Sequence, residues 1–140
     1  YRDLWKHIGK VLPKTATGAA RLSPFDLPNM LKTALNALYS HYEGEFERWR
    51  RAGIGVPPVF IVVCQNTAIS KLVFEWIAGF ERGDAEEGER AAFHAGHLEL
   101  SRNYDDQGGR LPRPRTLLID SRQIEAGDAL DGVVGAEEAD

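Results

Sequence analysis

Apolar residues recur at intervals of three and four between residues 27 and 49, a spacing typical of one face of an α-helix. The stripe consists of Leu27, Leu31, Leu35, Leu38, Tyr42, Phe46 and Trp49. Asp26 is the expected N-cap, Pro28 lies in the expected first turn, and Gly53 marks the expected end. The pattern therefore predicts a long amphipathic helix, on the order of 35–40 Å, which is long enough to bridge two domains.

A second pattern begins after Pro57 and Pro58. Residues 59–64 form an unbroken apolar run in which β-branched residues dominate. Such a run is typical of a strand buried on both faces of a parallel sheet that helices cover. We therefore predict a central parallel strand here. An amphipathic helix should follow it, marked by Ile69, Leu72, Val73, Trp76, Ile77 and Phe80.

A strand followed by a helix is predicted once more, with residues 115–120 as the strand and a helix from Ser121 through Leu130. Residues 97–104 alternate weakly and are interpreted as a short strand. The fold class is therefore α/β, a partial parallel sheet flanked by helices and preceded by the long amphipathic helix. We divide the chain into a helical inter-domain segment at 1–56 and an α/β unit at 57–140.

Composition places the chain among globular proteins and narrows its partners. Its 140 residues are 43% hydrophobic, enough for a core, and the net charge of −4 argues against a free-standing nucleic-acid binder with a basic surface. The single Cys64 excludes an internal disulfide and favours a reducing, cytoplasmic setting. No apolar stretch approaches the roughly 20 residues of a membrane span.

Motifs of common catalytic sites are absent from the sequence. It contains no Gly-rich loop ending in Gly-Lys-Ser/Thr, no G-x-S-x-G and no H-E-x-x-H. His94 and His97 have a spacing that suits a metal on a helix, but no convincing third ligand accompanies them, so we predict no metal site. The three tryptophans are interpreted as packing residues. We expect the isolated chain neither to bind nor to hydrolyse ATP.

One segment stands out because it joins the predicted buried strand to a helix N-terminus. Ligands bind at the carboxyl ends of strands in open α/β sheets, and the free N–H groups of a first helical turn attract phosphate oxygens. Asn66, Thr67, Ser70 and Lys71 are therefore candidate contacts to a nucleic-acid backbone. The alternative is that Asn66 and Thr67 only cap the helix and Lys71 is solvated. The same two interpretations apply to Ser121 and Arg122, after the second predicted strand.

Four segments together resemble a known family: residues 4–13 (LWKHIGKVLP), 34–42 (ALNALYSHY), 57–73 (PPVFIVVCQNTAISKLV) and 116–121 (TLLIDS). They are similar to the helicase-like restriction subunits of type III restriction enzymes and related DEAD/DEAH-box proteins. The resemblance extends to about Leu130. In that family the strand at 59–64 would begin the second of two RecA-like motor domains, so 57–140 would be the N-terminal part of that domain.

The resemblance implies a fragment of an ATP-dependent DNA helicase or translocase, and specifically of a type III restriction endonuclease subunit. ATP and Mg²⁺ would be the cofactors of the parent protein, bound outside these 140 residues. The implied partners are DNA, the first RecA-like domain of the same parent chain, and a modification methyltransferase subunit. Gln65 stands where many relatives have asparagine, and the sequence after Gly132 departs from the family. A stand-alone α/β binding or scaffold domain without a motor is the alternative.

Overall fold

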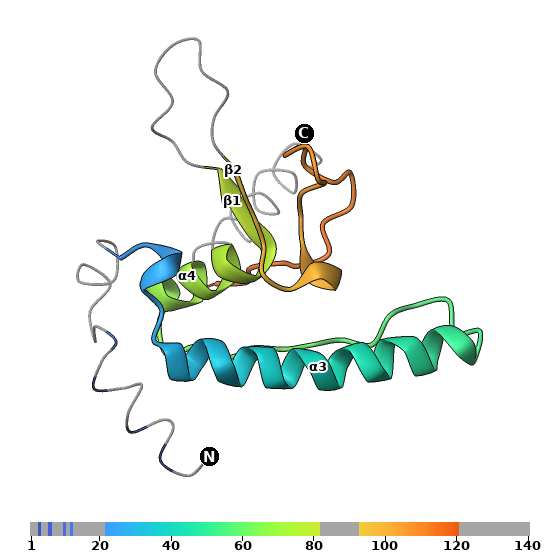
Figure 1. Cartoon of the computed structure of the whole chain (residues 1–140), viewed down its shortest axis with the longest axis horizontal. Helices are drawn as coiled ribbons and strands as arrows, with labels where there is room; N and C mark the ends of the chain where they lie inside the picture. The colour runs from blue at the N-terminus through green and yellow to red at the C-terminus, as the bar shows by residue number, and fades with distance from the viewer. Residues whose placement is uncertain are drawn as a thin grey trace, which may run out of the picture.

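The computed structural model describes residues 22–81 and 93–120, together with Asp3, Lys6, Lys10 and Leu12. Within these ranges a long helix lies beside a shorter helix and a small hairpin (Figure 1). The elements in chain order are η1 (Pro24–Asp26), α3 (Asn29–Arg51), α4 (Thr67–Ala78), β1 (Gly79–Glu81), β2 (Phe93–Ala95) and η2 (Glu99–Ser101). None of the described helices has both the length and the apolar character needed to cross a membrane.

The long helix begins two residues later than predicted. Asp26 does not cap it but belongs to η1, whose N-cap is Ser23. Ser23 and Asp26 form a capping box. The Ser23 hydroxyl oxygen accepts a hydrogen bond from Phe25 N (3.4 Å), and the Asp26 carboxylate accepts one from Ser23 N (2.8 Å). Pro28 is the residue before α3. The carboxylate therefore satisfies a local turn rather than the helix start.

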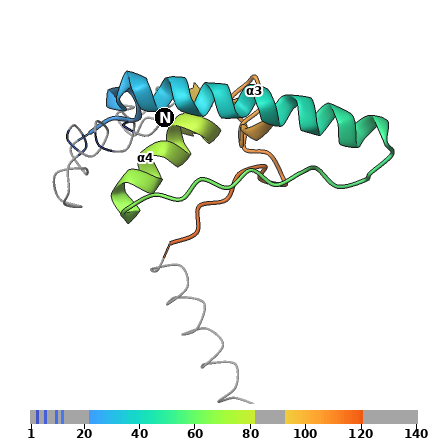
Figure 2. The ribbon, with the colours of Figure 1, turned by 90° about the horizontal axis from the view of Figure 1, so that it is seen from below.

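Helix α3 ends where the sequence predicts. Gly53 has a φ of 73°, in the left-handed region that glycine adopts without strain. Its N–H donates to the Arg50 carbonyl (3.1 Å) and the Ile54 N–H donates to the Trp49 carbonyl (3.1 Å). These two bonds are the Schellman pattern of helix termination. The chain then turns back and runs along α3 (Figure 2).

The buried face of α3 is shorter than the predicted stripe, because Tyr42, Phe46 and Trp49 are only half-buried, and it differs from the stripe at one further position. Leu31 and Leu35 are buried, as expected, but Leu38 is 54% exposed and Tyr39 takes its place in the core. Both residues fit a helical spacing from Leu35, so periodicity alone could not separate them. Tyr39 and not Leu38 is buried because its hydroxyl oxygen accepts a hydrogen bond from Leu100 N at 2.8 Å.

Helix α4 supplies most of the remaining core and confirms the predicted amphipathic helix. Its buried residues are Ile69, Leu72, Val73, Trp76, Ile77 and Ala78. Leu98, which is fully buried, packs into the same cluster as the α3 residues. Trp76 is 3% exposed, which confirms its interpretation as a packing residue. The core therefore contains residues from before and after position 57. The division of the chain into two domains at this position remains a prediction.

The sheet in the described residues is antiparallel and not parallel. Strands β1 and β2 pair with Phe80 opposite His94. The predicted strand at 97–104 is wrong, because β2 precedes it and η2 lies within it. Gly96 explains the approach of this segment to α4: a Cβ there would lie 1.9 Å from the Ile77 carbonyl oxygen, so only glycine fits. The described residues are thus mixed α and β, and they contain no RecA-like parallel sheet.

The predicted central strand is the largest correction. Residues 57–64 are extended but belong to no strand, and Val59, Ile61 and Val63 are exposed. Phe60 and Cys64 point the other way and pack against the core. The Phe60 ring lies 5.8 Å from that of Tyr42 on α3. One face of the segment is therefore covered by helix, and the predicted burial of both faces is wrong.

Residues 115–120 are extended in the same way and form no strand with the described residues. Asn103 holds their start in place. Its Oδ1 accepts from Arg115 N (2.8 Å) and Thr116 N (3.0 Å), and its Nδ2 donates to the Thr116 carbonyl (2.8 Å). Asn103 N in turn donates to Ala78 O at 2.9 Å, which ties this segment to the end of α4.

Candidate anion-binding site at the start of helix α4

The candidate site lies where the extended segment 57–64 passes into α4. Asn66 is the N-cap, with extended backbone angles, and its Oδ1 accepts a hydrogen bond from Ile69 N at 2.9 Å. The capping interpretation of Asn66 is therefore confirmed. Because this amide oxygen already serves the helix, Asn66 can offer a ligand only its Nδ2 donors.

Thr67 and Ser70 lie in the first turn and are half-buried. The Ser70 hydroxyl donates to the Thr67 carbonyl at 2.9 Å, and Ser70 N donates to Asn66 O at 3.0 Å. The Ser70 hydroxyl proton is therefore used within the helix. Of the two predicted hydroxyl contacts, Thr67 is the one with a proton left for a ligand.

The backbone of this turn retains donors. Among the described residues, the N–H groups of Thr67 and Ala68 have no hydrogen-bond acceptor. No acidic residue lies in the first turn, and the sequence carries no charged side chain between Arg51 and Lys71. A helix N-terminus carries about half a positive charge, so its field here is not cancelled by a neighbouring carboxylate.

Lys71 adds a full charge beside this turn. Its side chain is 68% exposed, and its Nζ lies 3.8 Å from Glu75 Oε1, one turn further along α4. The Glu75 side chain is itself only 24% exposed, but a pair at this distance, near the limit of contact and with an exposed lysine, contributes little. The lysine can therefore leave Glu75 for an anion. The four predicted residues Asn66, Thr67, Ser70 and Lys71 are thus brought together by one helical turn.

Ser121 and Arg122, the remaining predicted contacts, lie outside the described residues. Cys64, at the start of the site, is half-buried, and burial raises the pKa of its thiol. A thiol with a raised pKa is a poor nucleophile at neutral pH. The chemistry available at this turn is therefore the binding of an anion by amide donors and an ammonium group.

The two histidines with metal-like spacing pack against aromatic rings instead. The His94 ring lies 4.7 Å from that of Phe25 and 5.2 Å from that of Phe80. His97 stacks on Trp76 at 4.6 Å, and its Nδ1 lies 3.1 Å from the Trp76 carbonyl oxygen. In the part of the chain that the structure describes, no three potential metal ligands come together.

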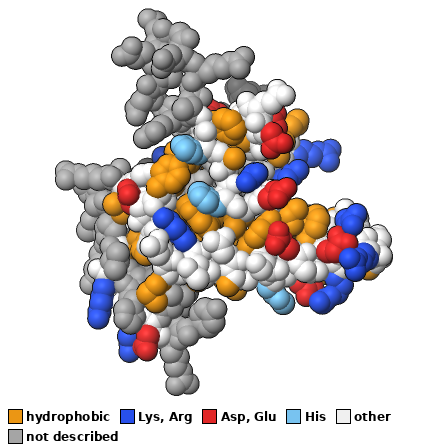
Figure 3. All heavy atoms as spheres, in the orientation of Figure 1, with side chains coloured by type: hydrophobic (Ala, Val, Ile, Leu, Met, Phe, Trp, Pro, Cys, Tyr) orange, Lys and Arg blue, Asp and Glu red, His pale blue; other side chains and the backbone are white. Residues whose placement is uncertain are grey.

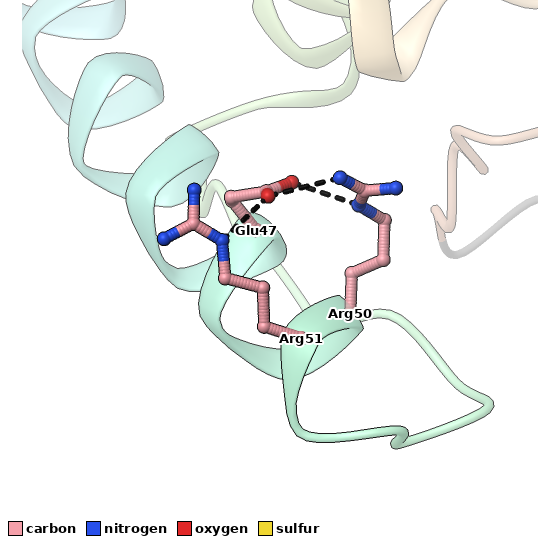
Figure 4. A network of polar contacts seen from close by, with 3 residues as sticks. All are labelled: Glu47, Arg50 and Arg51. Carbon is pink, nitrogen blue, oxygen red and sulfur yellow. Dashed lines mark hydrogen bonds and ion pairs between the residues drawn. The ribbon is translucent and has the colours of Figure 1, made fainter.

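A second group of positive charges, Arg48, Arg50 and Arg51, lies in the last turn of α3. Glu47 accepts hydrogen bonds from Arg50 Nε and Nη2 (2.8 and 2.9 Å) and from Arg51 Nε (2.8 Å) (Figure 4). These bonds, those from Arg50 first, lower the pKa of Glu47 to about 2. Arg48 pairs with Glu45 at 2.8 Å. Acidic and basic side chains consequently mix at this end of the molecule (Figure 3), and no purely basic patch forms there.

No protein-family description, curated protein or solved structure matches this chain.

Proposed function

We propose that the chain is part of an ATP-dependent DNA helicase or translocase, of the type III restriction endonuclease kind, and that the start of α4 contacts the DNA backbone. The observation that carries the proposal is the turn after the apolar segment 57–64. It combines two amides, at Thr67 and Ala68, that have no acceptor among the described residues, with the exposed Lys71. Amides at a helix start and a nearby lysine are a common arrangement for binding phosphate.

The extended segments support a motor-domain origin in a second way. Segment 57–64 is apolar, segment 115–120 has the apolar centre Leu117–Ile119, and both are extended and run in the same general direction in both views (Figures 1 and 2). Parallel strands of a RecA-like sheet would have this relation. In the proposed protein, residues 57–140 begin the second RecA-like domain, and 1–56 connects it to the first.

The contribution of this chain to the motor would be its grip on DNA. In such motors, ATP binding draws two lobes together and hydrolysis releases them. The sequence has no Gly-Lys-Ser/Thr loop, so no step of ATP chemistry is assigned to its residues. Contacts to phosphates hold a protein in register without reading bases. We therefore assign Lys71 and the α4 amides a role in sequence-independent binding.

Replacing Lys71 with alanine in the complete motor protein tests this role. Loss of one phosphate contact should weaken DNA binding about equally for all sequences and reduce the slope of log K against log salt by about one unit. The measurement is fluorescence anisotropy with two unrelated DNA sequences at several salt concentrations. DNA-stimulated ATP hydrolysis by the unmodified protein is measured in parallel.

Lys6→Ala is the matched control. Lys6 is 80% exposed and also faces an acidic side chain at the limit of contact, Asp3 at 3.9 Å. Lys6→Ala should leave the salt slope unchanged, because Lys6 is not one of the proposed phosphate contacts. An unchanged affinity and slope for Lys71→Ala would reduce the α4 start to a capped helix. Absence of DNA-stimulated ATP hydrolysis would remove the motor assignment itself.

A stand-alone binding or scaffold domain is the second candidate, favoured by a different observation. Leu117 and Ile119 are 70% and 74% exposed, and the apolar side chains at 59, 61 and 63 are exposed as well. Uncovered apolar surface of this kind is typical of protein interaction sites. In this case the isolated chain should bind a protein partner, and the ATP hydrolysis experiment separates the two candidates.

A further inference from the structure

The outer face of the segment after α3 carries three uncovered side chains, Val59, Ile61 and Val63, which we call the outer strip. They are 81%, 76% and 81% exposed. Alternate residues point to opposite sides of an extended chain, and Phe60 and Cys64 accordingly pack inward. Three large aliphatic side chains in a row thus face solvent although the opposite side of the same segment belongs to the core.

The backbone of the outer strip is also available. Between residues 55 and 65, no backbone N–H or carbonyl group is hydrogen-bonded to another described residue. The segment is rich in Val and Ile, which favour strands, and Pro57 and Pro58 limit pairing only before residue 59. An extended, apolar segment with free backbone groups is a template for pairing with another strand.

We propose that two copies of this chain associate by pairing residues 59–63 as antiparallel strands about a two-fold axis at Ile61. In this register Val59 of one copy lies opposite Val63 of the other, and the two Ile61 side chains lie opposite each other. Every cross-strand pair is then apolar, and pairs of β-branched residues are favourable. The proposal concerns the 140-residue chain on its own and does not depend on the motor function, in which residues 59–63 would pair with other strands of the parent sheet.

A second copy suits this surface because the segment is self-complementary. No charged side chain occurs between Arg51 and Lys71, so the two-fold arrangement brings no like charges together along the strip, despite the net charge of −4 of each chain. Symmetric dimers of this kind use the same patch twice. The strip is short, so its pairing buries less accessible surface than a standard interface, which buries about 1,600 Å². We therefore expect reversible association.

Sedimentation velocity of the 140-residue chain over a wide concentration range tests the proposal. We expect the average mass to rise from that of a monomer towards that of a dimer. Ile61→Lys should remain monomeric at all the concentrations, because the axis places its two ammonium groups face to face. Ile61 is exposed, so circular dichroism should show the fold of this variant unchanged.

Leu38→Lys is the matched control, since Leu38 is an exposed aliphatic residue on α3, outside the strip. It should form dimers as the unmodified chain does. A monomer at every concentration would overturn the proposal. So would a dimer that survives Ile61→Lys, or one that both lysine variants lose equally.

Disulfide trapping tests the register, in a Cys64→Ser background. A mixture of Val59→Cys and Val63→Cys chains should form mixed disulfide-linked dimers faster than either variant alone, because antiparallel pairing places residue 59 opposite residue 63. Fastest linking of Val59→Cys with itself would indicate parallel alignment and overturn the two-fold register. The two copies would then pair through the outer strip in a parallel and not an antiparallel arrangement.

Discussion

Tyr39 connects two parts of the chain that are 61 residues apart in sequence. It lies on the buried face of α3, and its hydroxyl oxygen accepts a hydrogen bond at 2.8 Å from the N–H of Leu100 in η2. Replacing Tyr39 with phenylalanine removes one oxygen atom and keeps the ring, so no large cavity forms. The change therefore keeps the packing of the aromatic ring and removes only the polar interactions of the hydroxyl, namely the Leu100 hydrogen bond and the interaction with Glu43.

The expected loss follows from what remains after the substitution. The net value of one neutral hydrogen bond is about 1 kcal/mol, and a donor left without a partner in a buried position costs roughly 1–3 kcal/mol. Tyr39 is 8% exposed and Leu100 is half-buried, so water reaches the orphaned N–H only in part. We expect Tyr39→Phe to lower the free energy of unfolding by about 1–2 kcal/mol.

Equilibrium urea unfolding, followed by circular dichroism and tryptophan fluorescence, measures this loss. Tyr42→Phe is the control. Tyr42 lies one turn further along α3 and is half-buried, and its hydroxyl makes no hydrogen bond to another described residue that would be lost. It should change stability by no more than about 0.5 kcal/mol. Equal effects of the two substitutions would refute the role of the Leu100 bond.

The stability of the same variant should also depend on alkaline pH differently from that of the unmodified chain. Burial raises the pKa of Tyr39 above its ordinary value of 10.0, more than the Leu100 hydrogen bond lowers it. A tyrosine whose folded pKa is raised stabilises the fold below the unfolded pKa, and this contribution is lost as pH rises through the folded pKa. The stability difference between the unmodified chain and Tyr39→Phe should therefore narrow above pH 10. A constant difference there would contradict the argument.

Two further predictions concern the other polar connections. Asn103→Ala should lower the free energy of unfolding by about 2–3 kcal/mol and speed hydrogen exchange at the Arg115 and Thr116 amides, whereas Asn36→Ala, on the exposed side of α3, should not. The Glu47 carboxylate, with its pKa lowered to about 2, should stabilise the end of α3 above pH 4.5 and lose this effect as pH falls towards 2. An NMR titration of Glu47 measures the midpoint, and Glu47→Gln should show no such transition.

Local signals in the sequence predicted the structure best where their partners lie within a few residues. Asn66 as a cap, α4 after it and Gly53 as the end of α3 all depend on hydrogen bonds to residues close by in sequence. The four predicted residues at the start of α4 are brought together for the same reason. Their binding of an anion stays a prediction, because it depends on a ligand and not on the fold alone.

Features set by distant partners were beyond these signals. The exchange of Leu38 for Tyr39 in the core depends on Leu100, and the clamp at Asn103 depends on Arg115 and Thr116. β1 was missed because Phe80 continues the helical pattern of α4, while its pairing partner His94 lies beyond residues 82–92. Asp26 was assigned to the wrong helix because a capping residue looks the same before a short turn and before a long helix.

Residues 59–64 show the difference between the environment that a segment favours and the environment that the fold provides. Six consecutive apolar residues favour an environment in which both faces of the segment are covered. Covering both faces needs a second layer, and among the described residues only the α3 side provides one, through Phe60 and Cys64. Val59, Ile61 and Val63 therefore remain in water, where each exposed aliphatic side chain forgoes about 1.5–3 kcal/mol of burial. A second copy paired along the edge of the segment would cover these side chains only from the side, and would therefore recover part of this free energy.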